Sequence, residues 1–262
     1  MIVLTRKNKN NIGDKKQGVI MLRIAFEFSS ERIPVSSNFL FLSYIKEALN
    51  STDPEYFRKL FYYNDKSNKI TKCYTFAVLP QNYKLDNKEF VSCENSKIQL
   101  VISSPDQEFI VNLYNGILRL EEFKYKGYTV VRKNIRIIKE KVINFPEVVF
   151  TTLSPICVKN KQGKYLDLED PEFKTELNYL ANLILKNYRG VGLKKELSFY
   201  PLSMKKRVVK LHEKFLDGKF FYVNSFVGDF KLSGDVEDLN LLYKLGLSFR
   251  RSEGFGLIEV VG

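Results

Sequence analysis

One order of secondary-structure elements, strand-helix-strand-strand-helix-strand, is predicted twice along this 262-residue chain. The strand segments are rich in apolar and β-branched residues, whereas the helical segments carry apolar residues at spacings of three and four. A unit with this order is the split βαβ, ferredoxin-like arrangement. The repeated pattern therefore predicts an α+β fold of two tandem ferredoxin-like domains, a shape that RNA-recognition modules also use.

The predicted elements place the boundary between the two domains. In the first half they cover residues 19–28, 37–50, 73–79, 98–103, 105–120 and 128–138, with a short helical turn that opens at Asp53-Pro54. In the second half they cover 147–158, 171–188, 195–200, 207–215, 220–232, 236–245 and 257–261, and Asp217-Gly218 predicts a hairpin turn. We expect a basic polar tail over 1–20, an N-terminal domain over 21–142 and a C-terminal domain over 143–262, joined near 139–146.

The charge balance indicates a polyanionic partner. The chain carries 42 Lys and Arg against 30 Asp and Glu, which gives a formal charge of +12. Such an excess favours nucleic acid, although some lysine-rich proteins are basic without binding it. A basic hairpin in the second half is the first candidate for RNA contact, and its residues are Lys205, Lys206, Arg207, Lys210, His212 and Lys214. A solvated hairpin whose lysines protect an edge strand is an equally weighted alternative.

Cysteine and histidine usage excludes several other kinds of site. Cys73, Cys93 and Cys157 are far apart, and His212 is the single histidine, so the spacing of a metal site is absent. We expect no metal, no cofactor and a reducing cytoplasmic location. No apolar run reaches the length that spans a bilayer, so we expect no membrane partner.

A loop near the C-terminus, residues 246–256, combines glycines with basic and hydroxyl side chains. Glycines let successive backbone N–H groups turn towards one anion, and guanidinium groups match phosphate oxygens. We therefore interpret the loop as an RNA phosphate site. Its candidate residues are Gly246, Ser248, Arg250, Arg251, Ser252, Gly254 and Gly256. The alternative is a helix cap followed by a surface loop.

Several segments together resemble the CRISPR repeat-processing endoribonucleases of the sixth Cas family, in the RAMP superfamily. They are Ile33-Pro34 and residues 150–158, 227–235 and 242–256. The last segment is similar to the family's glycine-rich loop, Gly-h-Gly-x5-Gly-h-Gly with h apolar, except that Ser248 replaces the second glycine. The resemblance spans roughly residues 21–262. It implies two ferredoxin-like domains and metal-independent cleavage of CRISPR precursor RNA that leaves a 2′,3′-cyclic phosphate.

The chain departs from the family pattern at the position of the usual general base. Many members carry a Leu-His pair after the first helix, a Tyr on that helix and a downstream Lys. Here the pair is Leu60-Phe61, Lys46 falls near the Tyr position, and Lys69 or Lys72 falls near the Lys position. A phenylalanine cannot transfer a proton. Lys46, Tyr62 and Lys72 are therefore the candidate catalytic residues, although packing or base stacking is the favoured alternative for Tyr62.

The preferred hypothesis is that the protein binds CRISPR repeat RNA and processes it slowly, through charge stabilisation by these lysines. A protein that binds the repeat without cutting it is the first alternative. A structural RAMP subunit of a CRISPR effector complex is the second, and a homodimer also stays open.

Overall fold

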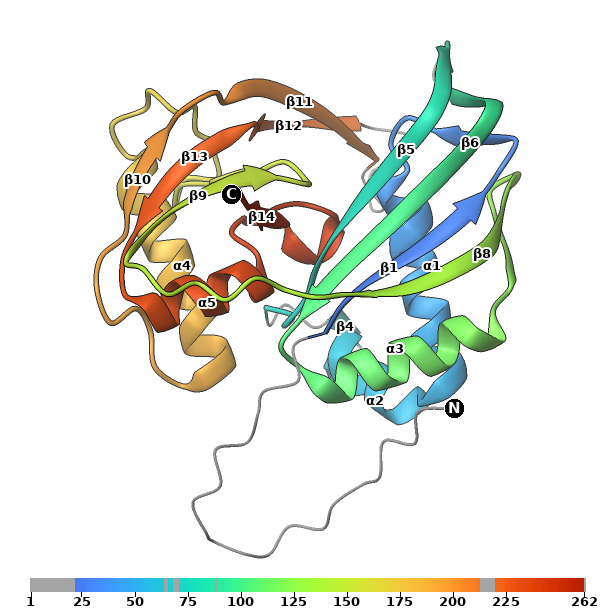
Figure 1. Ribbon diagram of the computed structural model, residues 1–262, viewed down its shortest axis with the longest axis horizontal. Helices are drawn as coiled ribbons and strands as arrows, with labels where there is room; N and C mark the ends of the chain where they lie inside the picture. The colour runs from blue at the N-terminus through green and yellow to red at the C-terminus, as the bar shows by residue number, and fades with distance from the viewer. Residues whose placement is uncertain (1–21, 64–65, 68–70, 88, 213–219, 262) are drawn as a thin grey trace, which may run out of the picture.

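Two antiparallel sheets, each with helices against it, form the body of the computed structural model, which describes residues 22–63, 66–67, 71–87, 89–212 and 220–261 (Figure 1). In the N-terminal half the main elements are β1 (Leu22–Ser29), α1 (Asn38–Thr52), β5 (Thr75–Asp86), β6 (Glu89–Ser104), α3 (Gln107–Arg119) and β8 (Tyr128–Ile138). These strands pair in the order β5-β6-β1-β8. The additions to this unit are β2 (Arg32–Pro34), α2 (Pro54–Phe61), β3 (Tyr62–Tyr63), β4 (Lys66–Ser67) and β7 (Glu122–Tyr125).

The C-terminal half repeats this strand order. Its main elements are β9 (Glu147–Thr152), α4 (Phe173–Arg189), β10 (Ser198–Pro201), β13 (Asp229–Ser233), α5 (Val236–Leu245) and β14 (Ile258–Val260). The sheet runs β10-β13-β9-β14. When the four main strands of each half are counted in chain order, both sheets have the same order, 2-3-1-4. A separate hairpin of β11 (Lys205–His212) and β12 (Phe220–Val227) is inserted between β10 and β13.

Aspartate caps start three of the helices. The Asp53 side chain accepts a hydrogen bond from the Tyr56 N–H at 2.9 Å, and Asp106 and Asp235 cap α3 and α5 in the same way. A cap of this kind satisfies backbone N–H groups that have no partner within the helix. The caps explain why these helices begin directly after Asp53, Asp106 and Asp235.

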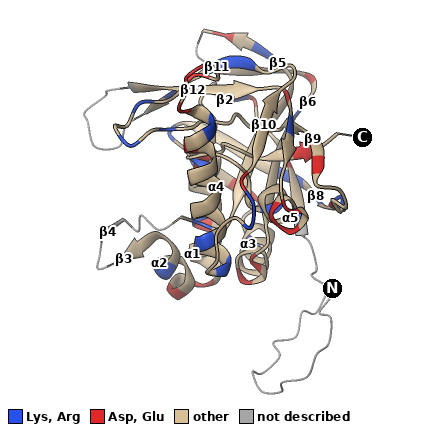
Figure 2. Cartoon of the chain, turned by 90° about the vertical axis from the view of Figure 1, so that its left-hand side faces the viewer, with Lys and Arg blue, Asp and Glu red and all other residues tan. Residues whose placement is uncertain are grey.

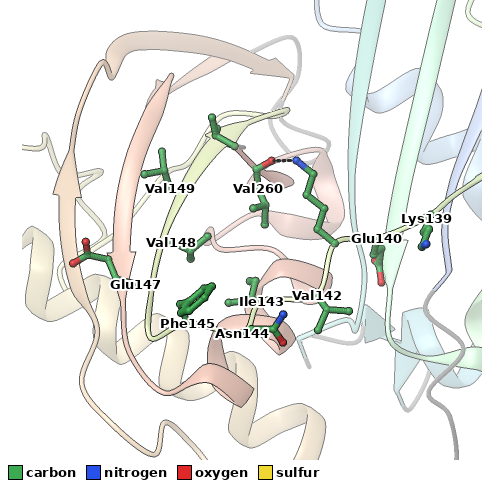
Figure 3. A pocket seen from close by; sticks show the side chains of 12 residues that line it. Lys139, Glu140, Val142, Ile143, Asn144, Phe145, Glu147, Val148, Val149 and Val260 are labelled. Carbon is green, nitrogen blue, oxygen red and sulfur yellow. Dashed lines mark hydrogen bonds between the residues drawn. The ribbon is translucent and has the colours of Figure 1, made fainter.

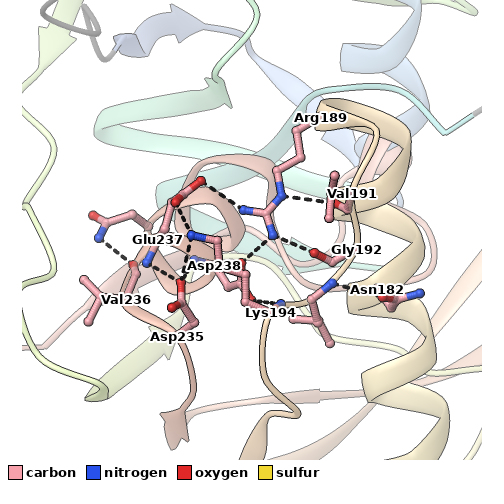
Figure 4. A network of polar contacts seen from close by, with 11 residues as sticks. Asn182, Arg189, Val191, Gly192, Lys194, Asp235, Val236, Glu237 and Asp238 are labelled. Atoms are coloured by element: carbon pink, nitrogen blue, oxygen red, sulfur yellow. Dashed lines mark hydrogen bonds and ion pairs between the residues drawn. The ribbon is translucent and has the colours of Figure 1, made fainter. Parts of the chain in front are cut away.

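A polar network fixes the segment that follows α4 (Figure 4). The buried Asp238 of α5 accepts from Arg189 Nη2 at 2.6 Å and from the Lys194 N–H at 2.7 Å. Gly190 adopts a φ of +82° and ends α4. These contacts hold the end of α4 against the start of α5, so the chain enters β10 in a defined direction.

Most of the predicted elements are confirmed, and the main correction concerns the predicted strand 220–232. Gly228 divides it into β12 and β13, which belong to different sheets. At Gly228 φ is +129°, and a Cβ atom there would lie 2.3 Å from the carbonyl oxygen of Ser203. The chain therefore changes direction at a point that favours glycine. The predicted tail 1–20 and the Asp217-Gly218 turn lie outside the described residues.

A buried arginine joins the two halves at the start of the first strand. Arg23 has no exposed surface, and it donates to the Glu259 carboxylate and to the carbonyl oxygens of Tyr243 and Ile258 at 3.2 and 3.1 Å. Its guanidinium carbon also lies 4.4 Å from the centre of the Tyr243 ring. One side chain of the first half is thus held by α5 and β14 of the second half.

Replacing Arg23 by Ala should lower the free energy of unfolding by about 3–5 kcal/mol, because the change leaves the partly buried Glu259 carboxylate without its cationic partner. The measurement is urea unfolding followed by circular dichroism. Arg32→Ala is the matched control on the neighbouring strand, since Arg32 forms an exposed 3.6 Å ion pair with Glu89. The control should cost less than about 1 kcal/mol, and equal losses for both variants would contradict the assigned role of Arg23.

Candidate functional site

Two lysines from distant segments meet at the aromatic ring of Phe61. The Lys46 and Lys72 ammonium nitrogens lie 4.9 and 5.8 Å from the centre of this ring. Lys46 belongs to α1, Phe61 ends α2, and Lys72 precedes β5. The structure therefore brings the predicted residues Lys46 and Lys72 to the ring of Phe61. Lys69, the alternative to Lys72, lies outside the described residues.

Packing of the surrounding elements explains why these side chains converge. Phe61 is buried and its ring centre lies 5.1 Å from that of Phe57, one turn earlier on α2. Lys46 is half-buried beside the core residues of α1. Two residues after Lys72, the buried ring of Tyr74 stacks on Phe109 at a centroid distance of 4.4 Å. Each lysine thus lies within two residues of a side chain that is packed in the N-terminal core.

Burial changes the acid-base character of one of the two lysines. Loss of solvent lowers the pKa of Lys72, and the negative charge of Glu253 opposes this shift. A lysine with a lowered pKa exchanges its proton at a pH closer to neutral than an exposed lysine does. Tyr62 is exposed and its ring packs edge-on against Phe57 at 5.8 Å, so it lies beside this site.

The glycine-rich loop contacts this site through its backbone and through one buried arginine. Arg251 is 4% exposed and donates to the carbonyl oxygens of Leu245 and, at 2.9 Å, of Lys72. Burial lowers the pKa of Arg251 to about 10. The Asn38 amide donates to the carbonyl oxygens of Glu253 and Gly254 at 3.1 and 3.2 Å. The loop therefore fastens the C-terminal half to both α1 and the Lys72 backbone.

Most of the loop residues that were predicted to contact RNA phosphate are buried. Ser248 is buried, and its hydroxyl accepts from the Cys157 N–H at 2.9 Å and donates to the Cys157 carbonyl at 3.2 Å. Among the described residues, Ser248 is not one of the non-glycine residues with positive φ. Gly246, Gly254 and Gly256 are buried too. Ser248 and Arg251 therefore direct hydrogen bonds to protein groups in this structure, and their contact with an RNA phosphate stays a prediction.

The remaining loop residues are only partly enclosed. Arg250 donates through Nε to the Tyr165 hydroxyl at 2.6 Å and pairs through Nη1 with Glu253 at 2.5 Å. Ser252 is half-buried, and its carbonyl oxygen accepts from the Tyr74 hydroxyl at 3.4 Å. Arg250 and Ser252 therefore keep some access to solvent, unlike Arg251.

The inserted hairpin presents one side to the core and the other to solvent. Leu211 and Val223 are buried together, whereas Val208 and Tyr222 are exposed, and Tyr222 is 62% exposed.

Among the predicted RNA-binding residues, the side chains of Lys205, Lys206 and Arg207 are exposed and Lys210 is half-buried. His212 ends β11, and Lys214 lies outside the described residues. The Ser36 hydroxyl donates to the Lys210 carbonyl at 2.7 Å, so the hairpin also touches the start of α1.

Basic residues occur on several elements around the molecule. In Figure 2, Lys and Arg are spread over helices α1 and α4 and over the inserted hairpin, with Asp and Glu between them. Some of these cations have local partners, since Lys206 pairs with Asp167 at 2.7 Å. Net charge alone therefore could not identify which basic residues face an RNA.

Sequence reasoning did not identify Glu253, Tyr165 or Lys159 as neighbours of the site. Glu253 was detectable, because an acid three residues after Arg250 is placed for an ion pair on a helical turn. Tyr165 and Lys159 carried no local signal, since only the packing of the 157–166 segment brings them to the loop. Lys159 lies 5.6 Å from the centre of the Tyr165 ring.

A pocket opens at the join between the halves, away from the elements that carry Lys46 and Phe61 (Figure 3). Its lining includes Val142, Phe145 and Val148, and Lys141 Nζ donates to the Val260 carbonyl at 3.0 Å across it.

Within the described ranges, no group of three or more His, Cys, Asp or Glu residues could hold a metal ion. The helices of the same described part are too short or too polar to cross a membrane.

Comparison with known proteins gives consistent matches. The family model described as CRISPR associated protein Cas6, C-terminal, matches residues 138–260. A CRISPR-associated endoribonuclease Cas6 of Methanocaldococcus jannaschii is 26% identical over 247 residues, which cover 90% of this chain and 92% of the relative.

Two solved structures share the fold over 92% of this chain. One is described as a RAMP protein binding different RNA substrates, with a TM-score of 0.76 and 23% identity over 100% of its chain. The other is a Cas6-related protein from Pyrococcus furiosus, with a TM-score of 0.77 and 22% identity over 98% of its chain. Residues 138–260 therefore match the Cas6 family model, and over 90% of its length the chain is similar to a Cas6 endoribonuclease.

Proposed function

We propose that this protein binds CRISPR repeat RNA in the cytoplasm and cleaves it without a metal ion, using two tandem ferredoxin-like domains over residues 21–142 and 143–262. The names of its relatives, an endoribonuclease and an RNA-binding RAMP protein, support this function. The equal strand order of the two sheets supports the domain assignment.

The convergence of Lys46 and Lys72 on Phe61 is the observation that carries the catalytic part of the proposal. In the proposal the two ammonium groups near this ring contact the same phosphate, and partial burial strengthens their attraction for it. The Lys72 backbone is fixed by Arg251, so its side chain starts from a defined position.

The chemistry requires only the RNA, these side chains and solvent water. Water accepts the proton of the RNA 2′-hydroxyl, the 2′-oxygen attacks the adjacent phosphorus, and the bond to the 5′-oxygen breaks as that oxygen takes a proton from water. The products are a 2′,3′-cyclic phosphate and a 5′-hydroxyl. Lys46 and Lys72 stabilise the charge on the phosphate oxygens during this step. Without a histidine base the reaction should be slower by about 10²–10⁴.

Exposed residues of the inserted hairpin supply the remaining RNA contacts in this proposal. Lys205, Arg207 and Lys210 lie on β11, and the exposed Tyr222 lies opposite Lys210 on β12. Cations that track a backbone and an aromatic ring that stacks on a base are the usual elements of single-strand binding. The contact between the hairpin and α1 places this surface beside the helix that carries Lys46.

Binding without cleavage is the second candidate, and the Phe61 ring specifically favours it. Each ammonium group lies within 6 Å of the ring centre, where a cation–π interaction is favourable in the absence of RNA. In that case the protein retains the repeat RNA, either alone or within an effector complex, and the two lysines serve affinity only.

Lys46→Ala and Lys72→Ala should each reduce the single-turnover cleavage rate at least about tenfold while changing RNA affinity much less, because they act on charge that develops in the reaction. Phe61→His should raise the rate. Cleavage should persist in EDTA and stop when the 2′-hydroxyl at the cut site is replaced by hydrogen. The control is Lys174→Ala, an exposed lysine on α4. Tight binding with no product over many hours would instead establish the binding-only function.

The cleavage rate should fall at high pH as Lys72 loses its proton. Because burial lowers the Lys72 pKa, the fall should begin below the pH at which an exposed lysine titrates. Glu253 raises this pKa, so Glu253→Gln should move the falling limb to lower pH. A pH-rate profile of both proteins tests this shift, with Glu237→Gln on α5 as the control. If the pH at which the rate falls is unchanged or higher in Glu253→Gln, the reaction does not depend on a charged Lys72.

The salt dependence of RNA binding should identify the hairpin contacts. Lys205→Ala combined with Arg207→Ala should reduce the slope of log K against log salt by about 1.4, since each lost phosphate contact on a single strand removes about 0.7. Lys174→Ala combined with Lys186→Ala, two exposed positions on α4, is the charge-matched control. An unchanged slope in the hairpin variant would remove the hairpin from the RNA path.

A further inference from the structure

Phe249 is an exposed aromatic residue in the middle of a buried loop. Its side chain is 46% exposed, whereas Leu247, Ser248 and Arg251 around it are buried. Single exposed apolar residues are common on protein surfaces and need no explanation by themselves. The surroundings of Phe249 are what distinguish it.

Lys159 and Tyr165 lie close to the Phe249 ring, and Arg250 links Tyr165 to Phe221. The Lys159 ammonium lies 5.3 Å from the centre of the Phe249 ring and 5.6 Å from that of Tyr165. The Tyr165 ring stands edge-on to Phe249 at 6.4 Å. The Arg250 guanidinium bonds the Tyr165 hydroxyl and lies 4.7 Å from the centre of the Phe221 ring. We call Lys159, Tyr165, Phe221, Phe249 and Arg250 the Phe249 cluster.

The backbone at the Phe249 cluster is held in place before any ligand arrives. The Phe249 N–H donates to the Cys157 carbonyl at 3.0 Å, and the neighbouring Ser248 hydroxyl is bonded to the same residue. Cys157 itself is fully buried. A ring presented from a fixed backbone loses little conformational freedom on binding, which favours its use as a recognition surface.

We propose that the Phe249 ring is the stacking platform for one unpaired nucleobase of the bound RNA, and that Lys159 contacts the phosphate next to that base. Aromatic rings beside mobile cations are the usual means of holding single-stranded RNA, because every base offers a face to stack and every nucleotide a phosphate. Tyr165 and Arg250 then serve as supports that fix the platform rather than as direct RNA contacts.

The position of the Phe249 cluster fits an RNA that also reaches the lysine pair. Arg250 pairs with Glu253, and the Glu253 carbonyl is held by Asn38 at the start of α1, the helix that carries Lys46. A short chain of contacts therefore connects the two sites across both halves. The inference rests on the proposed RNA-binding function and adds a base-recognition site separate from Lys46 and Lys72.

The test begins with an RNA that the wild-type protein selects from a single-stranded pool of randomised sequence. Phe249→Ala should weaken binding of that RNA by about 5- to 150-fold, the range for loss of one stacked base. Phe249→Tyr, which keeps the ring, should bind about as well as the wild type. The matched control is Phe145→Ala, since Phe145 is 73% exposed at the pocket of Figure 3 and lies outside the Phe249 cluster.

A scan with abasic nucleotides shows whether the loss reflects stacking. At one position, removal of the base should weaken binding to the wild type but not to Phe249→Ala, because both changes delete the same contact. Unchanged affinity of Phe249→Ala, or equal abasic penalties in both proteins at every position, would overturn the proposal and leave Phe249 free for a protein partner. A wild-type protein that selects no RNA would instead overturn the proposed function itself.

Discussion

The buried guanidinium of Arg251 is the interaction on which the arrangement of the two halves and of the candidate site depends. It joins the carbonyl of Leu245 at the end of α5 to the carbonyl of Lys72 in the first half. Burying a charged group is costly unless its hydrogen bonds are satisfied, and here the backbone carbonyls satisfy them. The position of Lys72 is thereby set by a residue 179 positions later in the chain.

The glycines around Arg251 allow the close approach that this bridge requires. Gly254 has a φ of +85°, and a Cβ atom there would lie 2.7 Å from the Asn38 amide nitrogen. At Gly246, a Cβ atom would lie 2.8 Å from the Thr75 side chain. Both contacts cross between the halves. In the proposed function the loop therefore fixes the lysine pair and presents Phe249, while several of its own residues are buried.

Much of the fold could be predicted from the sequence, because hydrophobic periodicity and capping residues act locally. The helical turn predicted to open at Asp53-Pro54 begins there, and β8 and α5 have the predicted bounds. Gly228 was harder to interpret, since the sequence does not distinguish a turn between two sheets from an irregularity within one strand. The burial of the 246–256 loop was not predicted for a related reason: glycines flanking paired arginines suit both an anion site and a buried bridge, and only tertiary packing decides between them.

The candidate site shows a similar division between what was predictable and what was not. The approach of Lys46 and Lys72 to Phe61 followed from the family resemblance, because no local pattern links α1 to the segment before β5. Phe249 and Lys159 could not be predicted, since an apolar residue in a loop is equally compatible with the core and with the surface. Their proximity depends on how the 157–166 segment packs against the loop.

The unfolding free energy of an Arg251→Ala variant tests most directly whether the loop is a structural bridge. If Arg251 joins the halves, the variant should lose about 3 kcal/mol or more in urea unfolding, because two charge-assisted hydrogen bonds disappear. Arg250→Ala, at the partly exposed neighbouring position, should lose clearly less. An Arg251→Ala variant that keeps wild-type stability but binds RNA with a flatter salt dependence would contradict the bridge and restore a direct phosphate contact.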